Sequence, residues 1–93
     1  DTSIEHIYPR NASLADQIPD IEPLKNTLGN LCIMDPEQNS TADNATFNDK
    51  KSIYRASTVK MLQEISNKSD WTTIDIEYSK NNMLNMALKI FRA

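Results

Sequence analysis

The chain has 93 residues, of which 39% are hydrophobic, and its formal net charge at pH 7 is −3. This length suits one small domain with a modest core, so we expect a single domain over residues 1–93. The sequence contains neither an apolar run that could span a membrane nor a recognisable signal peptide, which predicts a cytoplasmic domain without membrane partners. Because the chain begins with Asp1, we expect it to be part of a longer protein.

The charges are distributed unevenly along the chain. Residues 1–49 hold nine acidic and two basic residues, whereas residues 50–68 hold five basic residues and one acidic residue. The negative total argues against a nucleic-acid partner, since polyanions attract basic proteins. The basic middle segment argues the other way, because it would neutralise phosphates. A solvated helix face is the alternative interpretation of that segment.

The cysteine and histidine content excludes two kinds of stabilising site. With Cys32 as the only cysteine, no disulfide can form within the chain. With His6 as the only histidine, a structural zinc site lacks its four ligands. Cys32 lies between two aliphatic residues, and we expect it to be a buried apolar side chain.

Four triplets fit the acceptor pattern for N-glycosylation, and a secreted glycoprotein would show such triplets. However, a chain this rich in asparagine, serine and threonine produces one or two by chance. The absence of a signal peptide and of a disulfide pair argues against secretion. The triplets begin at Asn11, Asn39, Asn44 and Asn67.

The first half of the chain predicts two strands with a loop between them. Residues 2–7 are rich in β-branched side chains and favour a short strand that ends at Tyr8-Pro9. A loop follows, and residues 23–28 favour a short helix that Gly29 would end. The apolar run 31–34 predicts the second strand.

The second half predicts helices. Residues 35–49 suit either a loop or a short helix anchored by Phe47. Ser57 is a plausible N-cap for a helix that runs to about Ser66, and Thr72 or Thr73 would cap a final helix that ends near Phe91. The order of strands followed by helices indicates an α+β fold. We expect the apolar residues of the final helix to be core: Met83, Leu84, Met86, Ala87, Leu88 and Phe91.

The residues with the clearest chemical potential are Glu5 and His6. Adjacent strand residues point to opposite faces, so the pair could serve separate tasks, as a metal ligand and a general base. Asn39 follows Asn30 by nine residues, and amide oxygens, like carboxylates, bind hard cations such as Mg²⁺. The alternatives are a surface imidazole, an exposed acid, a turn asparagine at position 30 and a helix cap at position 39.

Taken in order, these residues resemble the HNH motif of the His-Me finger (ββα-metal) nucleases. The closer resemblance is to the C-terminal nuclease domain of the GmrSD-type modification-dependent restriction endonucleases, and it spans residues 2–91. It implies an α+β fold in which a ββα-metal core is followed by additional C-terminal helices. The matching pattern is Glu5-His6-x-x-Pro9, Gly29-Asn30-Leu31, Asn39, Asn44-x-x-Phe47-x-x-Lys50, Tyr54-x-x-Ser57 and Trp71.

The resemblance implies a DNA endonuclease that nicks phosphodiester bonds with one divalent ion, Mg²⁺ or Mn²⁺. His6 would be the general base, and Asn30 would fix the loop that carries it. Glu5 and Asn39 would hold the ion. The distribution of basic residues supplies the predicted DNA contacts, with Lys50 as the foremost phosphate ligand: Arg10, Lys50, Lys51 and Arg55.

The resemblance also implies an N-terminal nucleotide-hydrolysing domain in the full-length protein and a role in restricting modified phage DNA. One active site cuts one strand, so a double-strand break would need a second copy, as in a homodimer, or a second visit. The alternative function is a non-catalytic module on the same fold that binds nucleic acid or protein.

Overall fold

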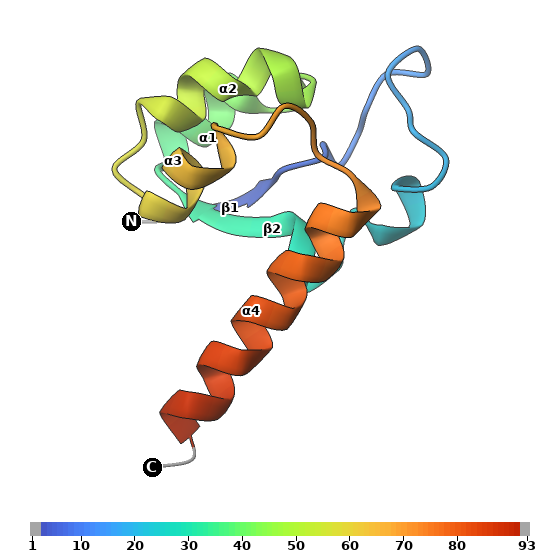
Figure 1. Ribbon diagram of the computed structural model, residues 1–93. Coiled ribbons are helices and arrows are strands. Elements are labelled where there is room, and N and C mark those ends of the chain that lie inside the picture. Colours follow the sequence, from blue (N-terminus) through green and yellow to red (C-terminus); the bar gives the residue numbers. More distant parts are fainter. Residues whose placement is uncertain (1–2, 92–93) are drawn as a thin grey trace.

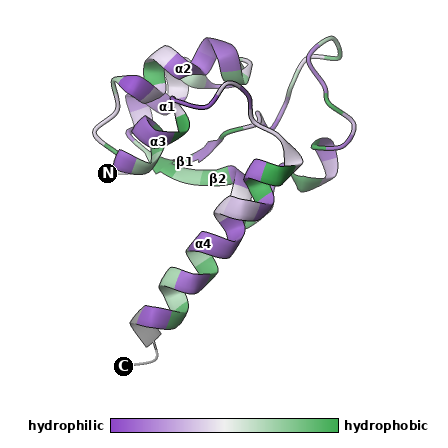
Figure 2. Ribbon diagram, in the orientation of Figure 1, coloured by the Kyte–Doolittle hydropathy of each residue, from purple (hydrophilic) through white to green (hydrophobic). Residues whose placement is uncertain are grey.

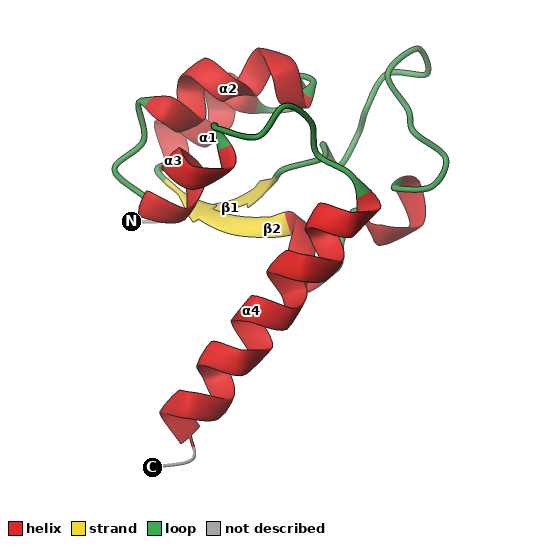
Figure 3. Cartoon of the chain, in the orientation of Figure 1, coloured by secondary structure: helices red, strands yellow, loops and turns green. Residues whose placement is uncertain are grey.

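The computed structural model describes residues 3–91, and Figures 1 and 3 show its elements. Two strands are followed by helices, so the α+β class predicted from the sequence is confirmed. The elements in chain order are β1 (Ser3–His6), the 3₁₀ turns η1 (Glu22–Leu24) and η2 (Leu28–Asn30), β2 (Leu31–Met34), α1 (Pro36–Ala42), α2 (Phe47–Arg55), α3 (Lys60–Ile65) and α4 (Thr73–Phe91).

The two strands form an antiparallel hairpin with one covered face and one open face. Glu5 lies opposite Cys32, and Ile4 lies opposite Ile33. Glu5 and Cys32 are buried, whereas Ile4 and Ile33 are about half exposed. Both predicted strands are therefore present, and helices α1, α2 and α3 gather on one side of the hairpin (Figure 1).

The sequence of residues 35–49 suits either a loop or a short helix. In the structure this segment contains one complete helix, α1, and the start of another, α2. The Asp35 carboxylate accepts the Glu37 amide at 2.9 Å and caps α1, and Pro36 occupies the first turn. The Thr46 hydroxyl accepts the Asp49 amide at 3.3 Å and caps α2. Local capping therefore starts both helices.

Helix α2 is the main element that the sequence analysis did not predict. Most of its residues are polar or charged, so the sequence shows no clear apolar face. The buried face of the helix consists of Phe47, Lys50 and Tyr54. The helix predicted over 57–66 is also shorter than expected. Its Ser57 hydroxyl accepts the Val59 amide in the turn before α3, so the helix begins only at Lys60.

Gly29 does not end a helix as predicted. It lies within η2, where a Cβ atom would sit 1.9 Å from the carbonyl oxygen of Ile76 in α4. The predicted helix over 23–28 is replaced by the 3₁₀ turns η1 and η2. A glycine is needed here because the backbones of η2 and α4 approach closely.

The bounds of α4 agree with the prediction, but the prediction that its apolar stripe is core is wrong. Leu84 is 47% exposed, and Leu88 is 57% exposed. The first turns of α4 pack against η2, and the later part of the helix projects from the body as a mixed polar and apolar rod (Figures 1 and 2). The side chain of Phe91 lies outside the described part.

The core lies between the hairpin and helices α2 and α3, and α4 contributes one residue to it. The buried apolar cluster comprises Ile7, Tyr8, Ala12, Ile21, Cys32, Met34, Phe47, Tyr54, Leu62, Ile65, Trp71 and Ile76.

Between residues 3 and 91, no helix is long and apolar enough to cross a membrane.

Candidate active site

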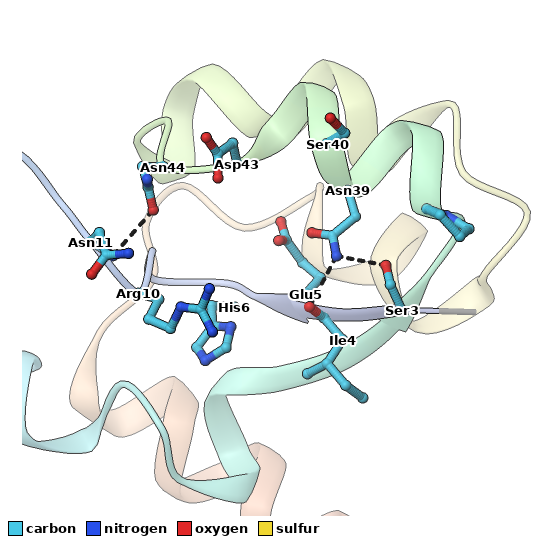
Figure 4. A pocket seen from close by; sticks show the side chains of 11 residues that line it. Ser3, Ile4, Glu5, His6, Arg10, Asn11, Asn39, Ser40, Asp43 and Asn44 are labelled. Atoms are coloured by element: carbon cyan, nitrogen blue, oxygen red, sulfur yellow. Dashed lines mark hydrogen bonds between the residues drawn. The ribbon is translucent and has the colours of Figure 1, made fainter. Parts of the chain in front are cut away.

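A cavity of about 350 Å³ lies where β1 faces α1 (Figure 4). Glu5, His6 and Asn39 all line it, so the fold brings the predicted base and both predicted metal ligands to one space. Two apolar residues, Ile4 and Pro36, also line it. The rest of the lining is polar and includes a cation beside His6: Arg10, with Ser3, Asn11, Ser40, Asp43 and Asn44.

Glu5 is almost completely buried and is held through one of its two carboxylate oxygens. Oε2 accepts a 2.6 Å hydrogen bond from the Tyr54 hydroxyl and lies 3.2 Å from the Lys50 ammonium. Burial raises the pKa of Glu5, while the Lys50 charge and the Tyr54 hydroxyl act in the opposite direction. Glu5 is thus a desolvated carboxylate that is paired with the Lys50 ammonium.

The prediction that Lys50 contacts DNA phosphate from the surface is wrong. Its side chain is fully buried, and burial lowers its pKa. Besides pairing with Glu5, the ammonium donates to the carbonyl oxygen of His6 at 2.7 Å and to that of Ile7 at 3.4 Å. Lys50 therefore joins the carboxylate of Glu5 to the backbone of His6 and Ile7.

Asn39, in the middle of α1, is anchored to β1 through its amide nitrogen. Nδ2 donates to the Ser3 hydroxyl at 2.6 Å and to the Ile4 carbonyl oxygen at 3.0 Å. These bonds leave Oδ1, the atom suited to a metal ion, on the side toward Glu5 (Figure 4). Asn39 is not the N-cap of α1, because Asp35 occupies that position.

His6, at the end of β1, has a side-chain partner that the sequence analysis missed. Its Nε2 lies 3.0 Å from Oδ1 of Asn26, in the loop before η2. An amide oxygen can only accept, so in a neutral imidazole this contact would place the ring proton on Nε2 and leave Nδ1 free to accept one. No motif marks Asn26 in the sequence, since its contact with His6 depends on the path of a long loop.

Asn30 is buried and uses its whole amide to fix the segment after His6. Its Oδ1 accepts the Tyr8 amide at 2.8 Å and the Trp71 indole N–H at 2.9 Å. Its Nδ2 donates to the carbonyl oxygens of Tyr8 and Lys25, both at 2.8 Å. Asn30 therefore binds backbone groups and the Trp71 indole, and it does not line the cavity.

The remaining predicted DNA contacts occupy different surroundings. Arg10 is exposed and lines the cavity beside His6 (Figure 4). Lys51 donates to the Ser69 carbonyl oxygen at 3.2 Å, and its ammonium lies 5.3 Å from the centre of the Phe47 ring. Arg55 is exposed at the end of α2. Arg10 alone of these lines the cavity.

The oxygen donors of the cavity fit a hard divalent ion. Among residues 3–91, no three His, Cys, Asp or Glu side chains cluster as metal ligands. Mg²⁺ does not require such a cluster, because it keeps several waters and takes one or two carboxylates together with substrate phosphates. Glu5 supplies a carboxylate, Asn39 an amide oxygen, and Asp43 a second carboxylate at the cavity edge.

The structure is that of a small α+β domain. Over residues 1–86 it matches the family model described as "GmrSD restriction endonucleases, C-terminal domain". The chain therefore belongs to this family, as the sequence pattern predicted. A search of curated proteins gives no significant match.

Proposed function

We propose that this domain is a metal-dependent DNA endonuclease of the HNH type that nicks one strand at a time. The observation that carries the proposal is the shared cavity of Glu5, His6 and Asn39, the three residues to which the resemblance assigns the chemistry. In this proposal β1, β2 and α1 form a ββα-metal core. The family supports DNA as the substrate.

The predicted base and the two predicted metal ligands have distinct roles in this proposal. Glu5 and Asn39 would hold one Mg²⁺ or Mn²⁺ ion through oxygen atoms. When bound, such an ion supplies charge stabilisation for the phosphate and for the leaving 3′ oxygen. Nδ1 of His6 would take the proton from the attacking water, while Asn26 keeps the other ring nitrogen protonated.

Arg10 is the proposed contact for a phosphate beside the scissile bond, since it lines the cavity next to His6. Lys51 and Arg55 on α2 would contact DNA farther away and contribute through general electrostatic attraction. Target choice, including any preference for modified DNA, would depend on a nucleotide-hydrolysing domain elsewhere in the full-length protein. A homodimer would deliver the second cut.

The test is nicking of supercoiled plasmid and of phage DNA with modified bases, with Mg²⁺ or Mn²⁺ and with a chelator. We expect divalent-dependent nicking by the parent and its loss in His6→Ala and Glu5→Gln. Asn82→Ala, an exposed change on α4, is the matched control and should cut normally. DNA binding without cleavage under any divalent ion would favour the interaction module and overturn the proposal.

A further inference from the structure

The side chain of Glu5 meets α2 through two residues that lie one helical turn apart. Lys50 and Tyr54 are at positions i and i+4 and therefore share a face of the helix. Both are fully buried, and both reach the same atom, Oε2 of Glu5, at 3.2 Å and 2.6 Å. This convergence holds one carboxylate oxygen from two directions.

The other carboxylate oxygen, Oε1, takes part in neither contact. Glu5 lines the cavity, and Figure 4 shows its carboxylate rising from β1 into the space below α1. A carboxylate held through one oxygen cannot rotate freely, so its second oxygen keeps a constant direction. Fixed ligand oxygens raise the affinity for a metal ion, because less order is lost on binding.

Lys50 also joins this carboxylate to the next residue of the strand. Its ammonium donates to the His6 carbonyl oxygen at 2.7 Å, so the same cation restrains the backbone of His6 and the side chain of Glu5. The helix that supplies it is itself fixed, because Phe47 in its first turn stacks on Trp71 with ring centroids 6.1 Å apart.

We propose that Lys50 and Tyr54 are positioning residues that hold Glu5 through Oε2 and direct Oε1 toward a divalent ion. The inference rests on the proposed function for its metal ion, but it concerns residues to which the sequence pattern assigned another role or none. A buried Lys–Glu pair that served stability alone would leave the metal affinity unchanged when the Tyr54 hydroxyl is removed.

The decisive variant is Tyr54→Phe, which removes one hydroxyl and keeps the ring in the core. The matched control is Tyr78→Phe, because Tyr78 lies on α4 and is 64% exposed. Binding of Mn²⁺ to the free protein is measured by electron paramagnetic resonance, without DNA. We expect about 10-fold weaker Mn²⁺ binding in Tyr54→Phe and none of this loss in Tyr78→Phe.

Nicking is then measured against Mg²⁺ concentration. We expect Tyr54→Phe to need about 10-fold more Mg²⁺ for half-maximal rate, with the rate at saturating Mg²⁺ largely retained. Lys50→Met is expected to weaken Mn²⁺ binding further, because it removes the ammonium that contacts both Oε2 of Glu5 and the His6 carbonyl oxygen. If Lys50→Met does not fold, the Mn²⁺ affinity of Tyr54→Phe still tests the positioning role.

The two proposals fail in different ways. Mn²⁺ binding without cleavage by the parent would overturn the proposed function, while a weaker site in Tyr54→Phe would still support the positioning role. Cleavage by the parent with unchanged Mn²⁺ affinity in Tyr54→Phe would overturn the positioning role alone. A parent that binds no Mn²⁺ would overturn both.

Discussion

The indole N–H of Trp71 donates a 2.9 Å hydrogen bond to Oδ1 of Asn30, across 41 residues of sequence. Asn30 immediately precedes β2, and Trp71 lies just before α4. Through the other bonds of Asn30 to Tyr8, this contact connects the segment after His6 with the start of the last helix. One buried amide therefore links the segment after His6 to the residues before α4.

Replacing that amide should destabilise the domain strongly. Asn30→Ala removes four hydrogen bonds and leaves the Tyr8 amide and the Trp71 indole N–H buried without a partner. We expect a loss of about 3 kcal/mol in the free energy of unfolding, measured with urea. Asn82→Ala, on the exposed side of α4, should change stability by less than about 0.5 kcal/mol. Equal stability of both variants would contradict the role of Asn30.

Gly29→Ala should also destabilise the domain, by overpacking. The added methyl group would meet the Ile76 carbonyl oxygen, which is backbone and cannot move aside without shifting α4. We expect a loss of about 1–3 kcal/mol, visible as a lower thermal midpoint. Thr58→Ala, at an exposed position before α3, provides the comparison and should unfold close to the parent.

Removing the partner of His6 should reduce the cleavage rate more than stability. Asn26 is exposed, so Asn26→Ala should change the free energy of unfolding by less than about 1 kcal/mol. Without its oxygen the imidazole is no longer held in one tautomer, and we expect about 10-fold slower nicking. Asn67→Ala is the control for the loss of an exposed amide. A cleavage rate equal to that of Asn67→Ala would exclude a role for Asn26.

Arg10 should influence DNA binding through a phosphate contact. The slope of log affinity against log salt is negative, and each lost phosphate contact makes it less steep by about 0.9. We expect Arg10→Ala to lose one such contact and to nick more slowly. Lys89→Ala removes an equal charge from the projecting end of α4 and should leave the slope unchanged. Identical slopes in the two variants would argue against DNA at this cavity.

Acid should weaken the start of α4 through Asp75. Burial favours a higher pKa for this carboxyl, but hydrogen bonds from Thr72 and the charge of Lys68 hold its pKa below the ordinary 3.8. A lowered pKa contributes stability that is complete above pH 3.8 and is lost as the pH falls through the folded value. We expect the thermal midpoint of the parent to decrease as the pH is lowered below 3.8. The thermal midpoint of Asp75→Asn should decrease less over the same pH range.

Local sequence signals determined the hairpin and the extent of the last helix. The apolar run of β2 and the β-branched residues of β1 suit strands in any context. Two threonines before a helical apolar pattern indicate the start of α4. The pattern of Glu5, His6 and Asn39 likewise indicated the residues that share the cavity. These features depend on residue type and spacing along the chain.

The tertiary structure alone decided what surrounds those residues. Lysine is rarely buried, so a basic run predicts a surface, and only the pairing of α2 with β1 brings Lys50 to Glu5. The Asn26 contact depends on how the loop returns to β1. The apolar stripe of α4 predicted core, yet Leu88 is exposed because the helix extends beyond the body that would cover it. Contacts between distant segments therefore determined burial and partners, which no local pattern encodes.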